Sequence, residues 1–373
     1  MATPTGQRAQ REEPARGRPR QLGFRMPAEW EPHEATWIAW PHNRQDWPGK
    51  FPTIPWVYAE IVRLLAQGEQ VRIFVQNAEA AATATRILER SGVDLARVEF
   101  HRQATDRVWT RDSGPIFVRR ETAAGRALGI CDFKFNAWAK YDDWKADDRL
   151  PAYVARKLKL PSWQPMAMRA SGKVQRVVLE GGSIDTDGAG LLLTTEECLL
   201  SEVQQRNPGL SREGIEEVLR ETLGIERVLW LGRGIAGDDT HGHIDDLARF
   251  VRPGTIVLAI EERTGDPNFE PLRENLARLE SARGLDDQPF EVVALPMPSP
   301  VVFDGRRLPA SYANFYIANA SVLVPVFNDR NDEKALRILS GLFADRPVIP
   351  VYCRDLVWGL GTLHCLTQQQ PAL

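Results

Sequence analysis

Short apolar strands alternate with helical stretches along the chain from Met26 onward. Runs rich in branched and aromatic residues recur between segments in which apolar residues return every three or four positions, as on one face of a helix. We predict helices at 58–65, 78–90, 153–158, 212–223, 271–283 and 333–343. We predict strands at 36–40, 71–75, 115–118, 177–179, 191–194, 228–230, 255–260, 292–294, 315–317, 322–326 and 348–351. This alternation indicates one α/β domain.

The strand and helix units return at uneven intervals. About five units of roughly 70 residues would fit the length of 373 residues. Because the intervals vary, the pattern alone does not separate a fivefold repeat from a doubly wound sheet. The chain has neither a GxGxxG motif after a strand nor a GxxxxGK[ST] motif, so a nucleotide-binding function has little support.

Residues 1–22 differ from the rest, because they carry many arginines and prolines and almost nothing that could be buried. Such a segment cannot offset its own ordering entropy. We therefore predict a disordered basic tail over 1–22 and a single folded domain over 23–373. The tail has no apolar stretch typical of a signal peptide.

Charge and cysteine usage narrow the class of protein further. The formal net charge is −3, which gives no indication of a surface that binds nucleic acid. No apolar run approaches the roughly 20 residues that span a bilayer. The four cysteines are far apart and form no CxxC pair, which argues against a zinc site or a disulfide framework. We expect reduced thiols in a cytoplasmic protein. A closed homodimer is expected only as the commonest assembly at this size.

Four polar segments interrupt the apolar pattern and could carry chemistry. They are Trp109 to Pro115, Leu179 to Ser183, Gly237 to Asp246 and Gly359 to Cys365. Each also has a plain structural interpretation: a surface ion pair at Asp112, a solvated turn at Glu180, an exposed acidic loop near 238 and a buried small side chain at Cys365.

The third segment fits a plain interpretation least well. In an extended segment His243 and Asp245 would point to the same face, about 7 Å apart, with Ile244 toward the core. Such a pair could bind and protonate a substrate. A metal site of His241, His243 and Asp245 is the less favoured alternative, because the chain has six histidines and no second cluster.

Together the four segments match the needs of guanidinium hydrolysis. A planar cation rich in donors is held best by carboxylates, here Asp112 and Asp245. Its carbon needs a strong nucleophile such as a cysteine thiolate. A histidine must protonate the leaving ammonia and then activate water, and Glu180 would orient and charge that histidine.

The chain resembles the agmatine deiminase family, which belongs with the peptidyl-arginine deiminase-like enzymes in the guanidine-modifying (pentein) superfamily. The matching stretches cover nearly all of the chain after the tail. They are MPAEWEPHEATWIAWP at 26–41, DRVWTRDSGPIFV at 106–118, FNAW at 135–138, LEGGSIDTDG at 179–188, LLTTEECLL at 192–200, GDDTHGHIDDLARFVRPG at 237–254, SYANFYIAN at 311–319 and GTLHCLTQQQPA at 361–372.

This resemblance implies a five-bladed α/β propeller of ββαβ units and no metal or organic cofactor. It implies that Cys365 is the nucleophile, His243 the acid and base, and Glu180 its support. Asp112 and Asp245 would bind the guanidinium, and Trp109 would pack on the substrate's methylene chain. The expected reaction converts agmatine and water to N-carbamoylputrescine and ammonia, so the expected partner is a small cationic guanidine substrate, with no nucleic acid or membrane.

Two departures from the family pattern bear on substrate identity. His241 stands where relatives often have an acid, and Trp138-Ala139-Lys140 replaces the usual W-G-G. Both changes could alter the entrance that reads the far end of the substrate. The alternatives are a peptidyl-arginine or free-arginine deiminase and, in another class, a catalytically silent propeller that binds cationic amines.

Overall fold

The computed structural model describes residues 17–122 and 125–373. Within these ranges, five sheets share one connectivity: an antiparallel pair of strands is continued by a parallel strand. Sheet by sheet, the strands are β20 (Gln368–Pro371), β1 (His33–Ala39), β2 (Gln70–Val75) and β3 (Val98–Arg102); β4 (Ile116–Thr122), β5 (Gly125–Cys131) and β6 (Ser162–Trp163); β9 (Asp185–Thr186), β10 (Leu191–Thr195) and β11 (Arg227–Leu231); β12 (Ala248–Arg252), β13 (Thr255–Ile260) and β14 (Glu291–Pro296); β17 (Tyr316–Ile317), β18 (Val322–Val326) and β19 (Val348–Tyr352).

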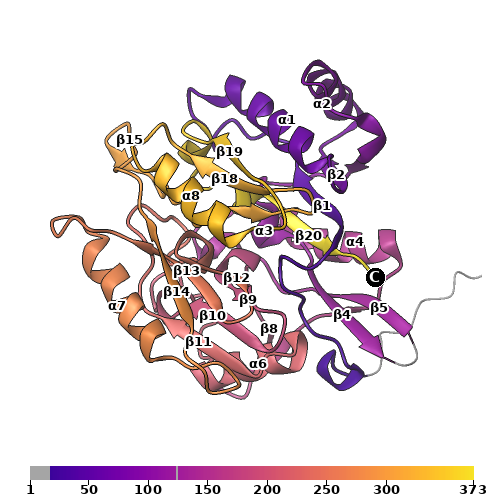
Figure 1. Ribbon diagram of the computed structural model, residues 1–373. Coiled ribbons are helices and arrows are strands. Elements are labelled where there is room, and N and C mark those ends of the chain that lie inside the picture. The colour runs from indigo at the N-terminus through magenta and orange to yellow at the C-terminus, as the bar shows by residue number, and fades with distance from the viewer. Residues whose placement is uncertain (1–16, 123–124) are drawn as a thin grey trace, which may run out of the picture.

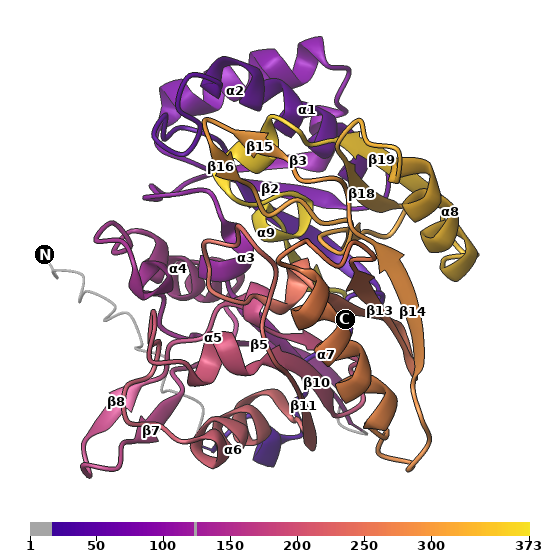
Figure 2. The same ribbon diagram turned by 90° about the vertical axis from the view of Figure 1, so that its left-hand side faces the viewer.

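The helices of the described residues are α1 (Ile54–Leu65), α2 (Ala78–Arg90), α3 (Thr110–Ser113), α4 (Leu150–Leu158), α5 (Glu196–Leu200), α6 (Arg212–Leu223), α7 (Phe269–Ser281), α8 (Asp332–Leu342) and α9 (Leu363–Leu366). The longer helices α1, α2, α6, α7 and α8 lie on the outside of the molecule, whereas the short helices α3 and α9 lie toward its middle (Figures 1 and 2). Two small hairpins, β7 (Met166–Met168) with β8 (Val174–Arg176) and β15 (Val302–Phe303) with β16 (Arg306–Arg307), complete the strands. None of the helices described is long and apolar enough to cross a membrane.

Helix α6 illustrates why the longer elements form where the sequence predicts them. The Ser211 side chain accepts a hydrogen bond from the backbone N–H of Gly214 at the start of the helix. Gly224 ends the helix at φ +73°, a left-handed conformation that glycine adopts without strain. Between these caps, every third or fourth residue is buried. Local chemistry and packing therefore agree.

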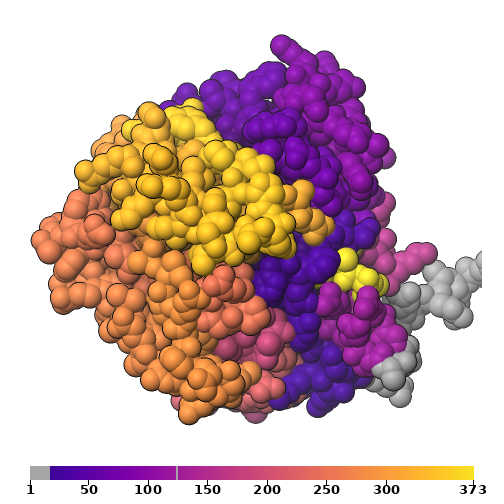
Figure 3. Space-filling model, in the orientation of Figure 1, coloured from indigo at the N-terminus to yellow at the C-terminus, as the bar shows by residue number. Residues whose placement is uncertain are grey.

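The N-terminal and C-terminal parts of the chain lie side by side (Figure 3). Strand β20 pairs antiparallel with β1, with Trp37 opposite Gln368. The sequence did not predict β20, because its glutamines are polar. They are buried against specific partners: Trp37 Nε1 donates to Gln370 Oε1 at 3.0 Å, and Arg111 Nη1 donates to Gln369 Oε1 at 2.7 Å.

The predicted strand at 177–179 is wrong. Val178 makes an isolated bridge with Lys134, and the neighbouring strand β8 lies earlier. Val177 donates its N–H to Pro165 and accepts from Lys134. Because these partners belong to different segments, an apolar run becomes a buried connection and not a ladder strand.

The predicted tail divides into two parts. Residues 1–16 lie outside the described residues. Arg20–Leu22 forms a short 3-10 helix, Arg18 lies 3.3 Å from Glu221, and the indole N–H of Trp163 donates to the carbonyl of Gly17 at 3.0 Å. Residues 17–22 of the predicted tail thus contact the domain predicted over 23–373.

Candidate active site

The four polar segments lie on short helical turns. Helix α3 carries Asp112, a 3-10 turn at Gly181–Ser183 follows Glu180, a 3-10 turn at Ile244–Asp246 follows His243, and α9 carries Cys365. These side chains are 0–6% exposed. The surface interpretations of Asp112 and Glu180 are therefore wrong, and residues far apart in sequence converge at one buried site.

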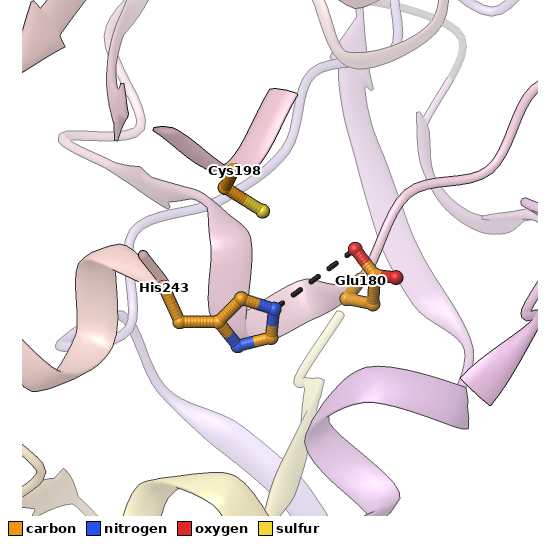
Figure 4. Close-up of side chains that lie close together, drawn as sticks. All are labelled: Glu180, Cys198 and His243. Atoms are coloured by element: carbon orange, nitrogen blue, oxygen red, sulfur yellow. Dashed lines mark ion pairs between the residues drawn. The ribbon is translucent and has the colours of Figure 1, made fainter. Parts of the chain in front are cut away.

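His243 lies among three carboxylates. Its Nδ1 is 3.8 Å from Asp112 Oδ1 and 4.0 Å from Asp245 Oδ1. Its Nε2 is 3.9 Å from Glu180 Oε2, and Figure 4 shows this pair. Burial alone would lower the pKa of His243. Asp112, contact with Cys198 and the charge of Asp245 instead raise this pKa well above its usual value. The ring is thus suited to carry a proton near neutral pH.

The predicted extended face of His243 and Asp245 is wrong in detail. The chain turns at Ile244–Asp246, where the N–H of Leu247 donates to the carbonyl of Ile244 at 2.9 Å. The turn brings the two side chains closer than an extended strand would. Ile244 is fully buried, as predicted.

Asp112 is held by two donors. Its Oδ1 accepts from the N–H of Gly182 at 3.0 Å, and its Oδ2 accepts from Trp138 Nε1 at 2.9 Å. Burial raises the pKa of Asp112 to about 6, and His243 opposes that shift while other carboxylates add to it. A Cβ at position 182 would lie 2.6 Å from Asp112 Oδ1 and 2.7 Å from His243 Nδ1, so only glycine fits there.

The thiol of Cys365 lies next to Asp245. Sγ is 3.6 Å from Asp245 Oδ2 and accepts a hydrogen bond from Asn314 Nδ2 at 3.0 Å. Burial, followed by the charges of Asp245, Asp246 and Asp112, raises the pKa of Cys365 well above its usual value. A cation placed among these carboxylates would offset the negative charges and favour the thiolate.

A buried network behind Asp245 was not predicted from the sequence. His364 Nδ1 lies 2.7 Å from Asp245 Oδ2, and its Nε2 lies 2.8 Å from Glu29 Oε2. Glu29 also forms ion pairs with Arg111 at 3.2 Å and Arg249 at 2.9 Å. Contact with His364 helps lower the pKa of Asp245 against the effect of burial. The one sequence signal that could have pointed to His364 is its position directly before Cys365.

The two carboxylate oxygens of Glu180 face different neighbours. Its Oε1 accepts from Arg206 Nε at 3.1 Å, whereas its Oε2 has no hydrogen-bond partner and faces His243. A buried, unpartnered carboxylate oxygen costs free energy of about 1–3 kcal/mol. The orientation of the Glu180 side chain is therefore better explained by a functional role in the site than by a contribution to stability.

Trp109 lines a narrow pocket that leads to Asp112 and Cys365. The pocket volume is about 30 Å³, with room for one or two waters. Its other walls are Arg107, Trp138, Tyr141, Asp239, Thr240, Gly359 and Leu360. A larger occupant would require the walls to move.

The two departures from the family pattern lie in different surroundings. Lys140 Nζ donates to Asp239 Oδ1 at 2.5 Å, and Tyr141 donates to Asp239 Oδ2 at 2.6 Å, so the change at Lys140 reaches a pocket wall. His241 Nε2 instead lies 3.1 Å from the Ser201 hydroxyl, and His241 is not among the pocket's lining residues.

The predicted exposed acidic loop is also wrong. Asp246 is buried and accepts from Asn314 Nδ2 at 2.9 Å. Asp238 Oδ2 accepts from the N–H groups of Gly242 at 2.7 Å and His243 at 3.1 Å. Both acids therefore shape the loop that presents His243.

The alternative metal site of His241, His243 and Asp245 is not formed in the described residues. The two groups of donor side chains that come together there are Glu180 with Cys198 and His243, and Asp245 with Asp246 and Cys365. Cys198 was not among the candidate residues that the sequence indicated, and nothing in its sequence context pointed to the site.

Solved structures of agmatine deiminases share this α/β fold. The enzyme of Enterococcus faecalis superposes with a TM-score of 0.85 at 30% identity, covering 96% of this chain and 98% of that chain. A structure of the C. jejuni agmatine deiminase gives a TM-score of 0.78 at 29% identity, covering 93% and 96%. A curated agmatine deiminase of Stutzerimonas stutzeri is 37% identical over 95% of this chain and 97% of its own length.

The family described as Porphyromonas-type peptidyl-arginine deiminase matches residues 25–371. The chain belongs to this family.

Proposed function

We propose that this protein hydrolyses the guanidinium group of agmatine, giving N-carbamoylputrescine and ammonia. The observation that carries the proposal is the convergence of Cys365, His243 and three carboxylates, with Cys365 and Asp112 lining one narrow pocket. The relatives named as agmatine deiminases, at 35–37% identity over most of the chain, support the choice of substrate.

In this proposal the cation is held by Asp112 and Asp245. A guanidinium offers donors in one plane, and carboxylates on either side can accept them as charge-assisted hydrogen bonds. Oδ1 of Asp245 has no hydrogen-bond partner and is free to accept one. Trp109 packs against the methylene chain.

Chemistry then proceeds in two halves. The bound cation favours the thiolate, so the Cys365 thiol releases its proton to solvent and Sγ attacks the guanidinium carbon. His243, which already carries a proton, donates it to the leaving nitrogen, ammonia departs, and a thiouronium remains on Sγ. Water next gives a proton to His243 and attacks the same carbon. The C–S bond breaks, the thiolate is regenerated and the urea product loses its extra proton.

Glu180 acts on His243 in this scheme. Its free oxygen faces His243 Nε2, where a negative charge stabilises the imidazolium that donates its proton in the first half and forms again in the second. Arg206 fixes the other oxygen and so the direction in which Glu180 points.

Free arginine is the second candidate substrate. The guanidinium of Arg107 lines the pocket, and a carboxylate is its natural partner, although Asp46 and Asp143 already contact it at 2.7 and 3.0 Å. The narrow pocket speaks against a peptidyl arginine. The buried Cys365 thiol beside Asp245, a carboxylate that also neighbours His243, argues against a silent amine-binding protein.

Ammonia release from agmatine, free arginine and a blocked arginyl peptide decides among these activities. We expect release from agmatine at the highest kcat/KM. Release from arginine or peptide alone would replace the proposed substrate. Agmatine binding without any ammonia would support the silent alternative.

We also propose that the five sheets are the blades of one α/β propeller over residues 23–373. Their shared connectivity supports this architecture. An experimental structure in which successive rotations about one axis superpose the five sheets would test it.

We further propose a cytoplasmic homodimer that needs no cofactor. Cell fractionation, sedimentation and an assay after exhaustive chelation test these three points. Secreted protein, a monomer or zinc-restored activity would each contradict one of them.

A further inference from the structure

Cys198 places a third donor beside the proposed acid and base. It lies on helix α5, where the Thr195 side chain accepts from its N–H and caps the helix. Figure 4 shows Cys198, His243 and Glu180 arranged around a common space. One ligand atom from each of the three lies within 4.8 Å of the other two, and all three side chains are buried.

Two of these atoms lack a partner. Glu180 Oε2 and His243 Nε2 make no hydrogen bond in the described residues, although Glu180 is 0% and His243 is 1% exposed. They face each other across 3.9 Å. Buried polar atoms are normally satisfied, so a pair left open toward a thiol indicates a place for a further group.

We propose that Glu180, Cys198 and His243 form an inhibitory Zn²⁺ site. They offer a carboxylate oxygen, a thiolate sulfur and an imidazole nitrogen, which are the donors that zinc binds in proteins. A water would fill the fourth position of a tetrahedral site. Zinc takes cysteine as the thiolate, so the thiol proton leaves to solvent on binding.

The surroundings support Glu180 as a ligand. Arg206 donates to Oε1 at 3.1 Å and leaves Oε2 for the metal. Hydrogen bonds of this kind orient metal ligands in known sites. Zinc bonds of about 2.0–2.3 Å in a tetrahedral site separate the donors by roughly 3.3–3.8 Å, so donor atoms that now lie within 4.8 Å of one another must approach by about 1 Å or less.

The second donor group is a poorer zinc site. Asp245 Oδ2 is occupied by His364, Asp246 Oδ1 accepts from Asn314, and Cys365 Sγ also accepts from Asn314. Binding a metal there would break existing hydrogen bonds and would use no imidazole. The open atoms favour the group that contains Cys198.

The inhibitory effect rests on the proposed function of His243. A zinc-bound ring nitrogen cannot exchange a proton, so the metal would remove the acid and base while leaving the Asp112 side of the pocket intact. Metal binding itself does not depend on that function and is measured separately.

Cobalt(II) is the probe for binding, because a thiolate ligand gives it a near-ultraviolet charge-transfer band. The full chain is titrated with Co²⁺, and bound Co²⁺ is then displaced with Zn²⁺. We expect one metal per chain and the thiolate band in the wild type and in Cys365→Ser. We expect Cys198→Ser to lose the band and to bind Zn²⁺ on the order of 100-fold more weakly. Cys353→Ser, at a buried thiol elsewhere, is the matched control.

Two other results would contradict the proposed metal site. A band that survives Cys198→Ser but is lost in Cys365→Ser would move the metal to Asp245 and Asp246. Absence of stoichiometric binding to the wild type would remove it altogether. Circular dichroism verifies folding, and Cys198→Ala replaces the serine variant if that variant does not fold.

The inhibition experiment measures ammonia release from agmatine, the proposed substrate. Zn²⁺ should inhibit ammonia release from agmatine in the wild type and Cys353→Ser at concentrations that leave Cys198→Ser active. Equal inhibition of all three would overturn the inhibitory role. If agmatine is not deiminated at all, the cobalt titration still decides whether the site exists.

Discussion

His364 holds Asp245 through a 2.7 Å contact between Nδ1 and Oδ2, and its other ring nitrogen lies 2.8 Å from Glu29 Oε2. Both ring nitrogens therefore face carboxylates. The residue directly before the proposed nucleophile thus connects Asp245, a proposed substrate-binding acid, to a buried ion-pair network. His364 is a positioning residue in this arrangement.

Replacing His364 by asparagine should lower kcat/KM on the order of 100-fold, because Asp245 loses its partner inside a buried site. The pKa of Asp245 is lowered in part by His364, so its pKa should rise in the variant. A second protonation should then enter the kcat/KM profile, which becomes steeper than tenfold per pH unit below the limb set by Asp112. A proportional loss at every pH would indicate a merely structural role.

Cys365→Ser should abolish turnover to below about 1% of wild type, since a neutral hydroxyl is a far weaker nucleophile than a thiolate. The variant should still bind agmatine, and its Tm should rise with agmatine concentration. Cys131→Ser and Cys353→Ser, at two other buried thiols, are the controls and should keep normal activity. Turnover well above 1% would assign the nucleophile elsewhere.

Asp112→Asn and Asp245→Asn should each lower kcat/KM by at least about two orders of magnitude, because a buried guanidinium would lose a partner. Glu180→Gln should reduce kcat more than it raises KM, because Glu180 contacts His243 and not the substrate. Normal efficiency in Asp112→Asn would refute the proposed clamp.

Asp238→Asn should cost more than a surface charge would, about tenfold in kcat/KM. Asp238 accepts from the N–H groups of Gly242 and His243, and an amide accepts fewer hydrogen bonds than a carboxylate. Asp142→Asn, at an exposed acid, provides the comparison. Equal kinetics in the two variants would restore the surface-charge expectation.

The acid limb of kcat/KM for the wild type should fall near pH 6. Burial raises the pKa of Asp112 to about 6, so this carboxyl group is protonated below that value and loses its charge for the cation. The rate constant should fall about tenfold per pH unit below the limb. A limb near pH 4, the ordinary range of a carboxylate, would show that Asp112 does not control binding.

Lys140→Ala should lower KM for agmatine several-fold with little change in kcat. Lys140 pairs with Asp239 on the pocket wall, and its removal leaves a free carboxylate for the distal ammonium group. Lys145→Ala, at an exposed lysine, serves as the control. An unchanged KM would place the distal end of the substrate away from Asp239.

The sequence by itself determined the longer elements and the residue types of the candidate site. Helix α2 matches the predicted bounds, and α6 ends at Gly224 as expected. Local signals suffice there, because caps and apolar periodicity act between residues a few positions apart. The four polar segments also stood out locally as interruptions of an apolar pattern.

Only the tertiary structure decided how those segments meet. The turn at Ile244–Asp246 brings His243 to Asp245, β20 becomes a strand through its pairing with β1, and Glu29 reaches His364 from the other end of the sequence. Cys198 joins Glu180 and His243 in the same way. Each depends on burial and on hydrogen bonds between residues remote in sequence. Hydrogen bonds of this kind are stronger where water is excluded. A local sequence pattern does not show which distant groups become buried together.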